Sequence, residues 1–139
     1  MDQLVELKKK YEGTFRQLSE ILAAERVRRV LVVDDEENSI KYIEKYIQAG
    51  SYLEKFYFET SGFRAKLILK SKKIDILVTD LRMPEISGVE LIEIARRCNP
   101  GIKIITVTAH SDGFAPVERG FFFKKPVDLG LLFAAISAA

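Results

Sequence analysis

Val30-Leu31-Val32-Val33-Asp34-Asp35 is the stretch of this sequence that says most about the fold. Its four apolar residues form a continuous run, which is typical of a strand buried on both faces in a parallel sheet. The run ends at two carboxylates, and similar apolar runs end at Asp80 and shortly before Lys125. Because parallel strands carry their carboxyl ends to one edge of the sheet, where such folds bind ligands, we expect these charged side chains to meet there.

Apolar segments of strand character alternate with helical patterns over the rest of the chain. Strands are expected at residues 30–33, 52–58, 74–79, 102–107 and 121–123, and helices at about 38–50, 62–69, 89–98 and 128–136. Asn38 or Ser39 is the expected cap of the first of these helices. Such alternation is typical of βαβ units, and right-handed crossovers then favour a doubly wound α/β layer.

Residues 1–27 are expected to form an amphipathic helix ahead of a domain at residues 28–139. One stripe of this helix carries apolar side chains such as Leu4, Leu7 and Leu18, while charged residues fill the other side. Two interpretations stay open. The helix lies on the surface of its own domain, or it pairs with a second chain as a short coiled coil and gives a homodimer.

The last helix carries no charge after Asp128. One buried face does not need so many apolar residues, so we expect a partner on its other side. The N-terminal helix, from the same chain or a neighbour, is the candidate for that cover.

Composition excludes several classes of protein. The chain has 139 residues, a net charge of +2 and a single cysteine, Cys98. One cysteine allows neither an intramolecular disulfide nor a cysteine-based metal cluster, and its helical position predicts a buried side chain. No apolar run is long enough to span a membrane and no signal segment is present, so a cytoplasmic location is the default expectation.

Five motifs at the expected strand ends resemble the receiver domain of two-component response regulators, over roughly residues 28–137. They are Val30 to Glu36, Thr79 to Pro84, Gly88, Thr106 to Ala109, and Lys124 to Pro126. The resemblance implies a flavodoxin-like fold, in which a five-stranded parallel sheet has the order 2-1-3-4-5.

The resemblance also implies a chemistry for the charged residues. Asp80 would accept a phosphoryl group, and Mg²⁺ would be held by Asp35, Asp80 and the backbone carbonyl of Arg82. Asp34 would act mainly through a metal-bound water. This set suits Mg²⁺, which prefers oxygen ligands and is typically held by one or two carboxylates plus phosphate oxygens.

Further roles follow from the same resemblance. Lys125 and Thr108 would stabilise the phosphoryl group from the side away from the metal, and Phe122 stands at the switch position. The peptide bond before Pro126 is expected to be cis. His110 is not expected to act in catalysis.

The sequence departs from the family between Thr108 and Lys125, where only sixteen residues intervene. Gly113 and Pro116 disfavour the helix that this interval usually holds. We therefore expect a helix of about one turn or a loop in its place.

The leading functional interpretation is a phosphorylated signalling switch, not an enzyme beyond its own phosphorylation. It would receive the group from a sensor histidine kinase or a phosphotransfer protein and act through protein contacts, without an output domain or direct binding of nucleic acid. An interaction module that no longer depends on phosphorylation is the alternative. A phosphatase is disfavoured because Arg82 stands where a second acid is needed, and the glycine motifs of nucleotide-binding loops are absent.

Overall fold

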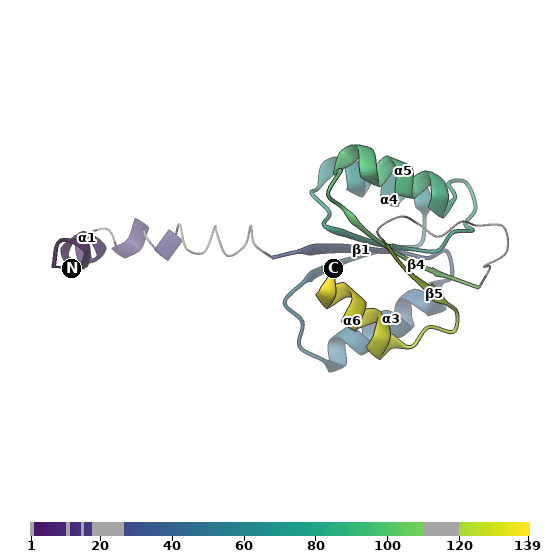
Figure 1. Ribbon diagram of the computed structural model, residues 1–139, viewed down its shortest axis with the longest axis horizontal. Coiled ribbons are helices and arrows are strands. Elements are labelled where there is room, and N and C mark those ends of the chain that lie inside the picture. Colours follow the sequence, from purple (N-terminus) through teal and green to yellow (C-terminus); the bar gives the residue numbers. More distant parts are fainter. Residues whose placement is uncertain (1, 11, 15, 18–26, 110–119) are drawn as a thin grey trace.

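The computed structural model of this chain describes residues 2–10, 12–14, 16–17, 27–109 and 120–139. A sheet lies between two layers of helices, with α4 and α5 on one side and α3 and α6 on the other (Figure 1). The order of elements is α1 (Asp2–Lys10), β1 (Arg29–Val33), α3 (Glu37–Ala49), β2 (Lys55–Glu59), α4 (Gly62–Ser71), β3 (Ile76–Thr79), α5 (Gly88–Cys98), β4 (Lys103–Thr108), β5 (Gly120–Lys124) and α6 (Leu129–Ala138).

The sheet has five parallel strands in the order β2-β1-β3-β4-β5, which confirms the predicted fold class and strand order. Val33, the last residue of β1, pairs with Thr79, the last residue of β3. The residues that follow them, Asp34 and Asp80, therefore leave neighbouring strands at the same edge of the sheet.

The central strand β1 explains why this order is stable. Its residues alternate between two apolar cores: Val30 and Val32 face the core under α3 and α6, while Leu31 and Val33 face the core under α4 and α5. All four side chains are at most 2% exposed. Burial on both faces is what a continuous apolar run in a parallel strand predicts.

The last helix, α6, is buried more fully by its own domain than its sequence led us to expect. Phe133 stacks on Tyr46 of α3 with ring centroids 4.8 Å apart, and it also contacts Tyr52 and Phe56. Of the large apolar side chains of this helix, only Leu131 is exposed. The rings of Tyr46, Tyr52 and Phe56 thus cover much of this helix within the domain, and a further cover by the N-terminal helix stays a prediction.

Arg28 ties the start of β1 to the end of α6. Its guanidinium donates to the carbonyls of Ile136 and Ala139 and to the carboxylate of Glu54, at 2.9 Å for Glu54. The last turn of α6 has no basic residue of its own. Arg28 supplies the positive charge that the carbonyl end of a helix favours.

Three local predictions differ from the structure. α3 begins after Glu36, without a side-chain cap from Asn38 or Ser39, because the Asp34 carboxylate accepts from the Glu36 amide and turns the chain directly after β1. β2 begins at Lys55, since the Tyr52 ring packs on α6 instead of extending the strand. Cys98 is exposed, because it lines a surface hollow between the ends of α4 and α5.

The N-terminal segment is only partly described. Residues 2–10, 12–14 and 16–17 are helical, in line with the predicted helix. Figure 1 shows α1 apart from the sheet and its helices. Leu18 lies outside the described residues, and neither proposed arrangement of this helix is tested.

Gly88, the first residue of α5, lies against the backbone at the end of β3. A Cβ at this position would stand 1.8 Å from the carbonyl oxygen of Asp80 and 2.7 Å from Cα of Leu81. The Gly88 amide donates to the carbonyl of Leu81 at 2.9 Å. Only glycine permits this close approach, which fixes the loop that follows Asp80.

We predict that Gly88→Ala lowers the free energy of unfolding by about 2 kcal/mol or more, because the added methyl group must displace backbone. Gly101→Ala is the matched control, since a Cβ there meets only the Asn99 side chain, at an ordinary 3.6 Å. Its effect should stay within about 1 kcal/mol. Urea unfolding measures both variants, and equal midpoints for the two would contradict the close contact.

Candidate functional site

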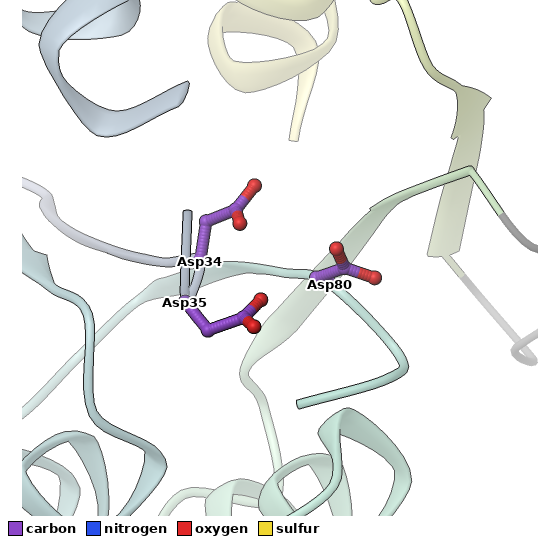
Figure 2. Close-up of side chains that lie close together, drawn as sticks. All are labelled: Asp34, Asp35 and Asp80. Atoms are coloured by element: carbon purple, nitrogen blue, oxygen red, sulfur yellow. The ribbon is translucent and has the colours of Figure 1, made fainter. Parts of the chain in front are cut away.

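Three carboxylates gather at the carboxyl edge of the sheet. Asp34 and Asp35 follow β1, Asp80 follows β3, and one oxygen of each lies within 4.8 Å of the others. Figure 2 shows the three side chains at the ends of these two neighbouring strands. Asp34 and Asp80 are 5% and 6% exposed, whereas Asp35 is open to solvent. The predicted convergence of these three residues is present.

Lys125 completes the cluster from the loop between β5 and α6. Its Nζ lies 2.7 Å from Oδ2 of Asp34 and 2.9 Å from Oδ2 of Asp80. The Lys125 amide donates to the carbonyl of Thr108 at 2.9 Å, and the peptide bond between Lys125 and Pro126 is cis, the isomer that the resemblance implies. One ammonium thus bridges two buried carboxylates from different strands.

Backbone amides hold the two buried carboxylates in place. The Glu36 amide donates to Oδ1 of Asp34 at 2.9 Å, and the Arg82 amide donates to Oδ1 of Asp80 at 3.3 Å. In both cases the donor stands two residues after the aspartate, in the turn that leaves the strand. The oxygens are therefore oriented by the chain itself before any ligand arrives.

The electrostatics of the pair follow from burial. Burial raises the pKa of Asp34, although hydrogen bonds from Lys125 and the Glu36 amide act to lower it. For Lys125 burial acts to lower the pKa, but hydrogen bonds to Asp34 and Asp80 outweigh it, so the pKa is raised. Lys125 is therefore charged at neutral pH.

Each shift has its own consequence for stability. The contribution of Lys125 is fully present below its usual pKa of 10.5 and is lost as the pH rises through the raised value. The raised pKa of Asp34 works in the other direction: its ionisation, as the pH rises above 3.8, costs stability. The ionised carboxylate of Asp34 therefore destabilises the folded state, and the hydrogen bond from Lys125 partly offsets that cost.

The donor set fits a hard divalent cation. Mg²⁺ favours carboxylate oxygens and keeps several waters. Asp35 presents its oxygens to solvent, and the buried Asp34 and Asp80 each place an oxygen within 4.8 Å of it. Three carboxylates against one ammonium leave an excess of negative charge, which a divalent cation would neutralise.

The remaining predicted residues lie at or beside this edge. Thr108 is fully buried at the end of β4, and its strand neighbour in β5 is Lys124. Phe122 pairs with Thr106 in the middle of β5 and is 42% exposed. The Arg82 side chain is exposed beside Asp80. His110, Gly113 and Pro116 fall within residues 110–119, outside the described part of the chain.

Sequence reasoning missed two features of the site. One is the close approach of Gly88 to the Asp80 carbonyl, since the sequence shows the glycine but not the backbone against which it packs. The Thr79 hydroxyl, which donates to the Asp80 carbonyl at 2.8 Å, had no distinguishing signal, since threonine is common in strands.

We predict that Lys125→Met lowers the free energy of unfolding in metal-free buffer by about 3 kcal/mol, because it leaves two buried carboxylates without their cation. Lys124→Met changes the exposed neighbouring lysine, and its effect should stay within about 0.5 kcal/mol. Urea unfolding in the presence of a chelator measures both. Similar losses in the two variants would show that the ammonium of Lys125 does not support the cluster.

Comparison with known proteins agrees with this geometry. The family model for the response regulator receiver domain matches residues 30–137. The transcriptional regulatory protein GlrR of Escherichia coli is 31% identical over 115 residues, which cover 79% of this chain and 26% of that protein. The DNA-binding transcriptional regulator NtrC of Salmonella typhimurium is 32% identical over 117 residues, which cover 81% of this chain and 25% of that protein. The chain thus spans about a quarter of the length of these relatives.

Solved structures give the same fold. A response regulator receiver protein from Sinorhizobium medicae has a TM-score of 0.70 and 26% identity, covering 81% of this chain and 94% of its own. The response regulator TrrA from Thermotoga maritima, solved in complex with Mg²⁺-BeF, has a TM-score of 0.69 and 26% identity. The match covers 81% of this chain and 98% of the TrrA chain. Among the described residues, no helix is both long and apolar enough to cross a membrane. The chain belongs to the receiver domains of two-component response regulators.

Proposed function

We propose that this receiver domain accepts a phosphoryl group on Asp80 in the presence of Mg²⁺ and signals through protein contacts. The observation that carries the proposal is the position of Lys125, whose Nζ contacts Asp34 and Asp80 while Asp35 completes the acidic cluster. An ammonium facing carboxylates across one small space provides both charges that phosphoryl transfer needs.

Asp80 is the proposed nucleophile because it stands at the phosphoacceptor position of the receiver motif, and Lys125 contacts it at 2.9 Å. An oxygen of Asp80 forms a bond to phosphorus as the bond from phosphorus to the donor breaks, and the leaving group keeps that electron pair. Such transfers depend mostly on positioning and on neutralising the phosphoryl oxygens. The Arg82 amide and the Lys125 ammonium already orient the Asp80 carboxylate.

Lys125 and Thr108 are proposed to bind oxygens of the transferred group. Lys125 is held by two carboxylates in the resting protein, so it can exchange them for phosphoryl oxygens without leaving its loop. Thr108 is joined to Lys125 through the hydrogen bond from the Lys125 amide. Removing one well-placed donor of this kind from an enzyme typically costs about a hundredfold or more in rate.

Mg²⁺, when bound, would neutralise the phosphoryl oxygens opposite Lys125. Asp35 and Asp80 are the proposed ligands, with the carbonyl of Arg82, and Asp34 would hold a water of the ion. The resemblance alone assigns this indirect role to Asp34, since its burial and its contacts match those of Asp80.

The proposed phosphoryl donor is a sensor histidine kinase or a phosphotransfer protein. The names of GlrR and NtrC identify transcriptional regulators, yet this chain spans only about a quarter of each. We propose that the present chain acts through protein contacts, without direct binding of nucleic acid. Phe122, which is partly exposed on β5, is the proposed position that reports phosphorylation, through a change of packing alone.

We predict that incubation with acetyl phosphate and Mg²⁺ adds the mass of one phosphoryl group and that Asp80→Asn abolishes this gain. Asp75→Asn is the matched control, since Asp75 stands just before β3 and Asp80 just after it. Intact-protein mass spectrometry measures the three proteins. A wild-type chain that gains no mass, and shows no response to beryllofluoride, would favour an interaction module independent of phosphorylation.

We predict that Mg²⁺ at a hundred times its dissociation constant stabilises the protein by about 2.7 kcal/mol, because it binds only the folded state. Asp35→Asn should remove most of this gain by deleting an exposed ligand. Glu37→Gln changes a nearby exposed carboxylate in the first turn of α3 and should leave it intact. Thermal unfolding with and without Mg²⁺ measures the difference, and an equal gain in both variants would exclude Asp35 as a ligand.

A further inference from the structure

A cavity of about 420 Å³ opens beside the acidic cluster, on the side of the sheet that α3 and α6 cover. Its walls are α3 and the loop formed by Lys125, Pro126 and Val127, and its floor includes Val32 and Val78. This volume falls within the range of about 300–1,000 Å³ that small-molecule sites occupy. Phosphoryl transfer at Asp80 makes no use of this apolar space.

Four of the residues that line the cavity are charged. Among its lining residues are three carboxylates, from Asp34, Glu36 and Asp80, and one ammonium, from Lys125. Figure 2 shows the Asp34 side chain on the side of the sheet that faces α3 and α6. Tyr42 lines the cavity as well and is 59% exposed. The cavity therefore combines an apolar floor with a net negative rim and an accessible aromatic ring.

We propose that this cavity binds a small organic cation, namely a primary amine that carries an apolar body. The apolar body would lie against Tyr42, Pro126 and Val127, the lining residues that reach solvent. The ammonium would bind Asp34 and Glu36. Lys125 shows that Asp34 accepts an ammonium at hydrogen-bond distance, since its Nζ lies 2.7 Å from Oδ2 of that residue. A carboxylate has about four acceptor sites, so Asp34 can hold a third donor beside the Glu36 amide and Lys125.

An amine in this cavity would oppose Mg²⁺. Asp34 and Asp80 belong both to the cavity and to the acidic cluster, so an ion that neutralises them removes the attraction for the ammonium. Such a coupling is reciprocal: the amine must weaken Mg²⁺ by the same factor. This second step rests on the proposed metal site, whereas binding of the amine does not.

The test compares 3-phenylpropan-1-amine with 3-phenylpropan-1-ol and 3-phenylpropanoate in metal-free buffer. The three probes share one apolar body and differ in charge. Two-dimensional NMR of the full chain should show shifts at Val32, Ser39 and Val127 with the amine, which should bind at least about fivefold more tightly than the alcohol. The carboxylate should bind most weakly. No shifts at these residues, or equal binding of all three probes, would overturn the proposal.

A filled cavity provides the control for location. Ser39→Leu adds a side chain to the α3 wall of the cavity and should reduce binding of the amine by about tenfold or more, because it occupies apolar space. Asn38→Leu makes the same change at the preceding residue, which is exposed and does not line the cavity. It should bind the amine as the wild type does. Equal loss in both variants would place the amine elsewhere.

Titration of Mg²⁺ into the amine complex separates this proposal from the proposed function. If Mg²⁺ releases the amine and lowers the affinity of the cavity for it several-fold, both the cavity assignment and the proposed metal site are supported. Amine binding that Mg²⁺ leaves unchanged, in a protein that Mg²⁺ also fails to stabilise, would overturn the metal site and leave the cavity assignment standing. Mg²⁺ stabilisation without any amine binding would overturn the cavity assignment alone.

Discussion

An ammonium shared between two buried carboxylates is the interaction on which the rest of this site depends. Burying a charge costs several kcal/mol unless a partner compensates it, so Asp34 and Asp80 need Lys125 as much as it needs them. The three residues come from the ends of β1 and β3 and from the loop after β5. The fold must therefore keep in one register strands that are far apart in the sequence. The two apolar cores on either side of β1 hold these strands in place.

Most of this arrangement could be predicted from the sequence, because it depends on patterns that repeat locally. Apolar runs such as Val30 to Val33 identify strands buried on both faces, and parallel strands leave little freedom in where their ends lie. Asp34 and Asp80 follow such runs directly, and Lys125 follows one after a single residue. Their convergence needed no knowledge of side-chain packing, only the strand order.

The parts that sequence reasoning missed depend on packing between distant segments. An excess of apolar residues in α6 predicts an external cover, yet rings from Tyr46 and Tyr52 already cover much of this helix. Cys98 has the spacing of a buried helical face, but its turn lies at a surface hollow. The approach of Gly88 to the Asp80 carbonyl and the cavity beside Lys125 likewise arise only once the layers are assembled.

The bonds of Arg28 to Ile136, Ala139 and Glu54 bring the first and last parts of the domain together, at the end of β1 opposite the acidic cluster. Ends that lie close together at the surface are what circular permutation requires. A short linker between residues 139 and 27 would join these two parts of the domain, and the exposed Ser51, between α3 and β2, offers a place to open the chain. New termini could then be moved around the domain without disturbing the edge that carries its charges.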